Sequence, residues 1–347
     1  MKSTLIQLAA SEVVLRHVRR RVARSGVTVF VYHDVGADEA VDDAWQIVRR
    51  RDFAAQVGHL LQHYEIVDLD TALHTLGEPA GRPGRPQAVL TFDDGLRGNH
   101  DHLLPMIEQL RVPVTIYVAT GHVENQQGYW FDRVANALQP GFEGHIDLGR
   151  HGLGRYTISG APGARRWSQV QRILVAAKSL DEARCIAVAD LVEAQVRAQA
   201  PAARTGMADV LAPMTVDMLR AVAGHPLVTL GVHTHGHELL PMLEPALARR
   251  TVVDAQDHIQ RWTGVRARHF AYPAGRSHAA SRQLVAGLGF VTAVGTQPGV
   301  WTRAVDPMNI PRMSVGRYDS LATFKLNAVG GLGRVLGRSS GQGPETL

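Results

Sequence analysis

Short apolar runs alternate with segments of helical spacing along most of this 347-residue chain. A short apolar run bounded by turn residues is typical of a buried strand, whereas apolar residues three and four positions apart are typical of an amphipathic helix. The strand-like runs lie at 27–32, 65–69, 88–92, 114–118, 227–232, 270–272 and 291–294, and the helical segments at 52–63, 100–110, 215–223 and 243–263. Regular alternation of the two favours an α/β architecture with a mostly parallel sheet.

Residues 138–212 interrupt this rhythm. Residues 140–162 are rich in glycine, which predicts a small hairpin or a loop. Residues 166–199 have helical spacing and contain neither glycine nor proline, which predicts a long helical stretch. We interpret 138–212 as a mainly helical insertion into the α/β domain, for which a lid over a site and a simple helical buttress fit equally well.

The two ends of the chain differ from the α/β region. Residues 1–25 combine an apolar stretch with a block of arginines, which predicts a basic amphipathic helix. Such a helix suits either packing on the domain or peripheral contact with an anionic membrane surface. Residues 319–347 predict a last helix, weakened by glycines, followed by a flexible tail, so the α/β domain is expected at 26–318.

Composition and charge narrow the class of protein. Hydrophobic residues make up 45% and charged residues 20%, as in ordinary globular proteins, and the net charge is +5. No nucleic-acid motif accompanies this charge, so we expect no nucleic-acid partner, and the oligomeric state stays open. The arginine block follows the apolar stretch, the wrong order for a secretory signal, and no apolar run approaches the roughly 20 residues that span a bilayer. We therefore expect a cytoplasmic location, at the inner face of the membrane if the N-terminal helix attaches there.

Two polar motifs directly follow predicted strands. Asp93 and Asp94, within Thr91–Gly95, follow the apolar run at 88–90, and His233 and His237 follow another such run at 227–232. Two imidazoles and one carboxylate form a ligand set for a divalent metal with open positions, and a second carboxylate beside them can move protons. Taken separately, an Asp–Asp pair is most often a turn or a helix cap, and the two histidines belong to a chain that has 17. Together, after strands, they predict a metal-dependent hydrolase site at the carboxyl edge of the sheet.

At this point the sequence resembles the polysaccharide deacetylase family, the carbohydrate esterase family 4 enzymes with a NodB-homology domain. Thr91–Gly95 is similar to the first family motif, and His233–His237 with Leu240 is similar to the second. Phe270–Gly275 resembles the third motif in a degenerate form. The resemblance runs over about 27–315, apart from the insertion, and implies a distorted (β/α) barrel with its site at the carboxyl ends of the strands.

The resemblance implies a role for each residue of these motifs. Asp94, His233 and His237 would bind one divalent metal ion, with zinc expected first and cobalt, nickel or ferrous iron also suited to the ligands. Asp93 would be the general base. The backbone N–H of Ala274 would stabilise the oxyanion of a tetrahedral intermediate.

Two further family residues are absent from their usual places. No leucine-x-histidine-aspartate motif follows residue 275, but Val31–Asp34 matches it at the end of the first strand. This resembles the circularly permuted exopolysaccharide deacetylases and would make His33 the general acid, against the alternative of a strand-end histidine with local hydrogen bonds. Ala271 stands where many members carry an arginine that orients the base. Arg312 is our candidate to supply that guanidinium, against the alternative of a surface salt bridge.

Aromatic residues are candidates for contacts with substrate. Trp130 follows the 114–118 strand and suits either stacking on a sugar ring or packing under the insertion, and Tyr272 belongs to the third motif. The resemblance as a whole implies a hydrolase that removes N-acetyl groups from amino sugars of a polysaccharide or glycolipid precursor. The alternatives are a deformylase or other amidase of the same fold, and a carbohydrate-binding protein without turnover.

Overall fold

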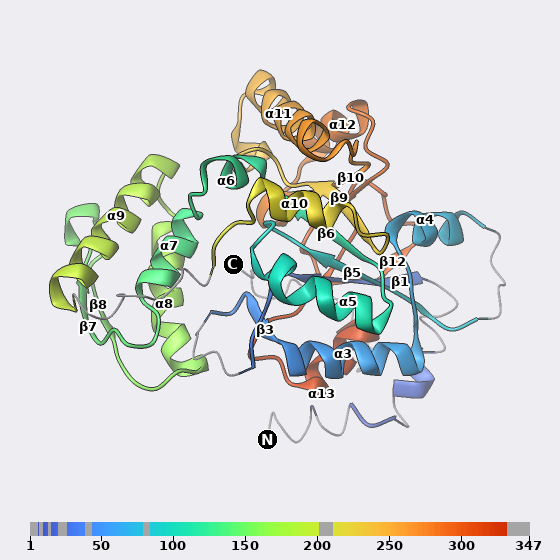
Figure 1. Ribbon diagram of the computed structural model, residues 1–347, viewed down its shortest axis with the longest axis horizontal. Coiled ribbons are helices and arrows are strands. Elements are labelled where there is room, and N and C mark those ends of the chain that lie inside the picture. The colour runs from blue at the N-terminus through green and yellow to red at the C-terminus, as the bar shows by residue number, and fades with distance from the viewer. Residues whose placement is uncertain are drawn as a thin grey trace.

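The chain folds around one curled sheet, shown in the computed structural model of Figure 1, which describes residues 6, 10–12, 15–19, 26–38, 44–78, 84–200 and 211–331. The strand order is β11–β10–β9–β6–β5–β1–β12, with β4 beside β5 and β13 also paired to β1. These pairs are parallel, except that β12 runs antiparallel to β1. The strands are β1 (Gly26–Tyr32), β4 (Glu65–Ile66), β5 (Gln87–Phe92), β6 (Val114–Val118), β9 (Val228–Val232), β10 (His269–Ala271), β11 (Thr292–Val294), β12 (Trp301–Thr302) and β13 (Met313–Ser314).

Helices pack on the outer face of this sheet and enclose the main core (Figure 1). Because side chains alternate along a strand, Leu90 and Phe92 of β5 point into this core, whereas Val89 packs with Tyr117 and Trp301 on the other face. The helices around the sheet are α3 (Arg50–His63), α4 (Leu69–Gly77), α5 (Leu104–Leu110), α6 (Thr120–Asn125), α10 (Val216–Ala223), α11 (Pro245–Thr263), α12 (Ala279–Gly287) and α13 (Leu321–Ala328). This is the α/β, distorted (β/α) barrel that the sequence predicts.

Shorter elements extend the strand ends. A π-helical turn, η1 (Asn99–Leu103), precedes α5, and the small parallel pair β2 (Asp34–Gly36) and β3 (Ile47–Arg49) continues beyond β1. The 3-10 turns η3 (Leu240–Met242) and η4 (Pro273–Gly275) follow β9 and β10.

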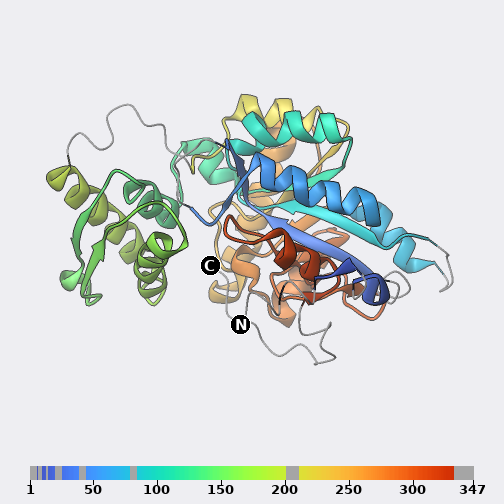
Figure 2. The same ribbon diagram turned by 90° about the horizontal axis from the view of Figure 1, so that it is seen from below.

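A second lobe projects from one end of the sheet, as Figures 1 and 2 both show. It has its own hydrophobic core, in which Trp167, Ile173, Val188 and Val192 are buried. The predicted hairpin within 140–162 is present as an antiparallel strand pair. The elements of the lobe are α7 (Trp130–Ala137), β7 (Gly144–Asp147), η2 (Gly149–His151), β8 (Arg155–Ile158), α8 (Ala164–Ala177) and α9 (Glu182–Gln199).

The structure refines the extent of two predicted elements, and an aspartate N-cap explains each new boundary. The strand expected at 65–69 ends at Ile66, because the Asp68 carboxylate accepts the Thr71 N–H at 2.7 Å and starts α4. The helical stretch expected at 166–199 is two helices, because the Asp181 carboxylate accepts the Arg184 N–H at 3.0 Å and starts α9. Each cap is a local signal for the start of a helix, which the spacing of apolar residues does not reveal.

The two ends are described only in part. Residues 15–19 of the predicted N-terminal helix are helical, and buried Leu15 packs with Leu326 and Val329 at the end of α13. Most of 1–25, and the predicted tail from 339, lie outside the described residues. The last predicted helix is present as α13. Within the described part of the chain, no helix has the length and apolar character needed to cross a bilayer.

Candidate metal and active site

Parallel pairing brings the two polar motifs to one edge of the sheet. Asp93 and Asp94 follow β5, His233 follows β9, and only β6 lies between these two strands. His33 follows β1, the neighbour of β5 on its other side. Since the carboxyl ends of parallel strands share an edge, residues 200 positions apart along the chain meet there.

Asp94, His233 and His237 form a compact group of three candidate ligands. Asp94 Oδ1 lies 3.4 Å from Nε2 of His233 and 3.7 Å from Nε2 of His237. Tetrahedral ligands at about 2.1 Å from a metal would be separated from one another by about 3.4 Å. The two distances to Asp94 are close to this value, and all three ligand atoms lie within 4.8 Å of one another.

The rest of the His233 ring is already oriented for metal binding. Its Nδ1 lies 2.8 Å from the Ala271 carbonyl oxygen, to which it donates. Metal-bound imidazoles commonly use their second nitrogen in this way, and here it directs Nε2 toward the Asp94 carboxylate.

Backbone strain is concentrated at this edge. Of the six described non-glycine residues with positive φ, four lie here: Asp94 (75°), Thr234 (62°), His237 (63°) and Ala274 (50°). Such conformations cost roughly 1–3 kcal/mol each and persist where the surrounding structure holds them. Their grouping indicates that the fold keeps these four residues in position for a purpose other than stability.

Arg312 holds the second carboxylate. It is fully buried, and its guanidinium donates to both oxygens of Asp93, at 2.8 and 2.6 Å. It also donates to the Thr91 hydroxyl at 3.0 Å and to the Gly295 carbonyl at 2.7 Å. The structure thus places Arg312 against the candidate base, and the alternative of a surface salt bridge is wrong.

The protonation states of these residues depend on burial and on their mutual charges. Burial alone would lower the pKa of His233, but its hydrogen bond to Asp94 and the charges of Asp93 and Asp94 raise it above its ordinary value. Burial alone would raise the pKa of Asp93, but the charge and hydrogen bonds of Arg312 hold it below its ordinary value. Burial would likewise raise the pKa of Asp94, but His233, His33 and His237 hold it well below its usual range. Burial, together with the charge of His233, lowers the pKa of His237 to about 3, so this imidazole is neutral at pH 7.

His33 lies beside Asp93 at the end of β1. The Asp93 N–H donates to the carbonyl of the preceding residue, Tyr32, at 3.0 Å. Asn99 in the π-helical turn donates from Nδ2 to the His33 carbonyl at 2.9 Å, which anchors this strand end. The Trp45 ring lies edge-on to the imidazole with centroids 5.5 Å apart, and the buried Nδ1 of His33 has no partner among the described residues.

An aromatic pair from the lobe packs on a candidate metal ligand. The rings of Tyr129 and Phe131 lie edge-on to His237, with centroids 5.0 and 5.5 Å away. Tyr129 also donates from its hydroxyl to the Asp94 carbonyl at 3.1 Å. Trp130, the predicted candidate between them, packs on Phe131 and on the core of the lobe. Because α7 begins at Trp130, the directions of the side chains at 129–131 differ, and those of Tyr129 and Phe131 face the site.

The remaining predicted residues are distributed between site and core. Ala274 lies in η4, in the turn that follows β10. Tyr272 is buried in the main core and donates from its hydroxyl to the Met308 carbonyl at 3.0 Å, so its side chain is a core residue. His235, between the two candidate ligands, lies 2.9 Å from the Thr120 hydroxyl and is not one of the three.

Comparison with known proteins agrees with this geometry. A sequence profile of the polysaccharide deacetylase family matches residues 80–293. The matched region contains all three motifs but neither His33 nor Arg312. No curated protein matches the chain.

Solved structures share the fold at low sequence identity. IcaB from Ammonifex degensii superposes with a TM-score of 0.56 at 17% identity, covering 88% of this chain and 97% of its own. The Streptococcus pyogenes deacetylase PplD, solved in complex with acetate, gives 0.54 at 15% identity over 85% and 95%. A de-N-acetylase from Aggregatibacter actinomycetemcomitans gives 0.55 at 13% identity over 87% and 99%. The profile covers more than half of the sequence, and the chain therefore belongs to the polysaccharide deacetylase family.

Proposed function

We propose that this chain is a metal-dependent N-deacetylase that releases acetate from N-acetylated amino sugars of a polysaccharide or glycolipid precursor. Family membership supports a deacetylase that acts on a saccharide. The single observation that carries the finer proposal is the juxtaposition of the Asp94, His233 and His237 group with an Asp93 carboxylate clamped by Arg312. A protein that only binds sugar needs neither a metal-ligand set nor a clamped carboxylate beside it.

The proposed ligands are Asp94, His233 and His237. Their spacing, the neutral His237 imidazole and the orienting hydrogen bond on His233 all fit a divalent ion. Such an ion, when bound, supplies Lewis-acid polarisation of the acyl oxygen and of the attacking water. Two imidazoles and a carboxylate suit zinc first, and also cobalt, nickel or ferrous iron.

Asp93 is the proposed general base. Both of its oxygens are held by Arg312, so the carboxylate cannot rotate away from the metal-ligand group. Its lowered pKa, caused by Arg312 against the opposing effect of burial, keeps it ionised in the neutral range. It is thus ready to accept a proton from the attacking water.

His33 is the proposed general acid, which donates a proton to the leaving amine. It stands at the neighbouring strand end, and Asn99 fixes its backbone. The backbone N–H of Ala274 is the proposed donor to the oxyanion, presented by a turn whose positive φ the fold maintains. Although β1 comes first in the chain, it lies beside β5 in the sheet, and this places His33 next to the strand end that carries Asp93.

The direct test is acetate release from N-acetylglucosamine oligomers by zinc-loaded protein. We expect release that stops with a chelator and in Asp93→Asn, because the variant keeps the shape of the side chain but cannot take a proton. Asp217→Asn is the matched control, since that side chain is 89% exposed on α10. Zinc binding without acetate release, but with formate release from N-formylated sugars, would show that the chain is a deformylase and not a deacetylase. Zinc binding without any hydrolysis would contradict the proposal.

A further inference from the structure

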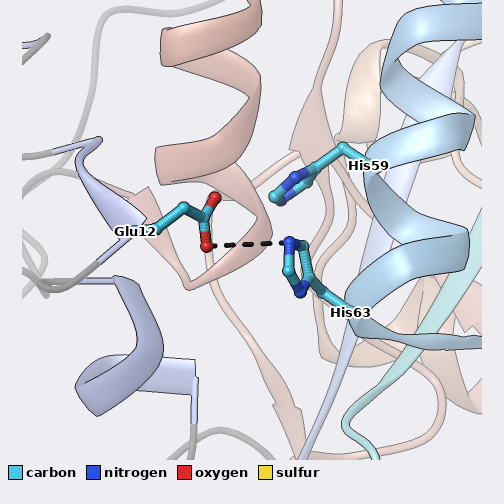
Figure 3. A group of neighbouring side chains, drawn as sticks. All are labelled: Glu12, His59 and His63. Atoms are coloured by element: carbon cyan, nitrogen blue, oxygen red, sulfur yellow. Dashed lines mark ion pairs between the residues drawn. The ribbon is translucent and has the colours of Figure 1, made fainter.

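A second group of candidate metal ligands lies away from the active site. Glu12 comes from the N-terminal segment, and His59 and His63 come from the last turns of α3 (Figure 3). The chain leaves α3 for the start of β4, so this group lies toward the amino edge of the sheet. The active site occupies the opposite, carboxyl edge.

The two histidines present one face of the helix to the carboxylate. Residues four apart on a helix lie above one another, and the His59 and His63 rings have centroids 4.8 Å apart. The Glu12 Oε2 atom lies 3.6 Å from His63 Nε2. One ligand atom from each of the three residues falls within 4.8 Å of the others. Figure 3 shows both rings turned toward the Glu12 carboxylate.

An unsatisfied nitrogen at this position is independent support. His59 is only 6% exposed, and its buried Nε2 has no hydrogen-bond partner among the described residues. A buried polar atom without a partner is costly, and a bound ion is one way to satisfy it.

Neighbouring cations set a condition on any ion bound here. Arg19 donates to Glu12 Oε2 at 2.9 Å, and the Lys325 ammonium lies 3.5 Å from Oε1. A cation bound through either oxygen of Glu12 therefore competes with a basic side chain. Two basic side chains close to the ligands weaken cation binding by charge repulsion, and removing Arg19 should strengthen it.

We propose that Glu12, His59 and His63 form a second divalent metal site, which ties the N-terminal segment to α3. Two imidazoles and a carboxylate suit zinc, cobalt or nickel rather than magnesium or calcium. The site has no catalytic part, since it lies at the other edge of the sheet from Asp93. Its role is to fix the segment around Glu12 on the domain, next to the contact of Leu15 with Leu326.

Zinc titration of the full-length, metal-free protein tests the proposal in two backgrounds. We expect two zinc ions for the wild-type protein and one for His233→Ala, in which the proposed catalytic site is disabled. In the His233→Ala background, His63→Gln should weaken the remaining site at least about 10-fold, because loss of an outer-shell partner alone costs 10- to 100-fold. His63 is the first choice for substitution because its side chain is 27% exposed and tolerates change better than buried His59.

Controls separate this site from general histidine binding and from misfolding. His74→Gln removes an exposed histidine that pairs with Glu78 on α4, and it should leave the stoichiometry unchanged. Glu12→Gln should repeat the effect of His63→Gln from a different segment of the chain. Arg19→Gln should tighten binding, which an unspecific site would not show.

The outcomes distinguish this proposal from the proposed function. His63→Gln alone should keep one zinc ion and full acetate release. A His233→Ala protein that binds no zinc, or one whose zinc affinity is unaffected by both His63→Gln and Glu12→Gln, would overturn the second site. Failure of acetate release would leave the stoichiometry of the His233→Ala protein intact and would bear only on the catalytic proposal.

Discussion

At the scale of single residues, the Asp93–Arg312 pair shows how the fold prepares a carboxylate. The pair is buried, and the guanidinium uses four hydrogen bonds to hold the carboxylate, a strand hydroxyl and a loop carbonyl together. Removing one member of a buried pair leaves an uncompensated charge, so conservative changes are the informative ones.

Arg312→Lys should lower the kcat of acetate release about 100-fold with little change in KM. Lysine keeps the charge but cannot hold both carboxylate oxygens, and a misplaced catalytic group costs on this order. Arg303→Lys is the matched control, because Arg303 is exposed and donates to the Gly77 carbonyl, away from Asp93. An unchanged kcat in Arg312→Lys would show that the clamp does not position the base.

Asp34 gives a pH-dependent prediction. Burial raises its pKa to about 8, from 3.8, against the opposing hydrogen bonds from Val35, Gly98 and Asn99. The folded state thus holds this proton more tightly than the unfolded chain, so its contribution to stability is complete below about pH 4 and is lost as the pH rises toward 8.

Substitution of Asp34 by asparagine should remove this dependence. Urea unfolding of both proteins between pH 4 and 8 should show the wild-type protein losing free energy of unfolding relative to Asp34→Asn as the pH increases. A constant difference between the two proteins would mean that Asp34 is ionised throughout.

At the scale of elements, the residues of the candidate active site lie in the turns that follow the strands. The η4 turn holds Ala274 with φ 50° and Gly275 with φ 66°. A Cβ on Gly275 would collide with the backbone nitrogen and side chain of Thr296. This close approach explains why the residue after the proposed oxyanion donor is glycine.

Gly275→Ala should therefore displace the turn and reduce kcat by about 100- to 1,000-fold, the usual effect of losing one oxyanion donor. Gly289→Ala is the matched control, since Gly289 also has positive φ (90°) but its Cβ would meet nothing within 4 Å. The control shares the backbone strain without the collision. Equal effects of the two changes on kcat would argue against a special role for η4.

The start of α7 connects the lobe to the proposed metal ligands. Tyr129→Phe removes the hydroxyl that donates to the Asp94 carbonyl but keeps the ring against His237. Zinc affinity of the catalytic site should fall by about 10- to 100-fold, as for other outer-shell contacts. Tyr156→Phe is the control within the lobe, because its hydroxyl donates to the Leu153 carbonyl. Competition with a metal indicator in a His63→Gln background measures the effect, and equal affinities would contradict it.

At the scale of the whole molecule, metal binding should be linked to folding. The three proposed ligands come from two strand ends far apart in the chain, so the unfolded state has no equivalent site. At free zinc 100-fold above Kd, the catalytic site should add about 2.7 kcal/mol to the free energy of unfolding. Urea unfolding of His63→Gln with and without buffered zinc measures this, and His63→Gln/His233→Ala should show no such gain.

The sequence by itself determined the local features of this protein. Strand positions follow from apolar runs such as 88–92 and 114–118, because a short apolar run bounded by turn residues is typical of a buried strand. Asp93, Asp94, His233 and His237 follow from the same logic, since parallel strands end at one edge. Family resemblance added roles for these residues.

Only the tertiary structure decided which distant side chains meet. Arg312 lies 219 positions from Asp93, and its contact depends on the parallel pairing of β13 with β1. Tyr129 rather than Trp130 approaches His237, because the start of α7 sets the directions of consecutive side chains. Local spacing fixes what each segment forms, whereas contacts between segments depend on strand order and packing, which no single stretch of sequence encodes.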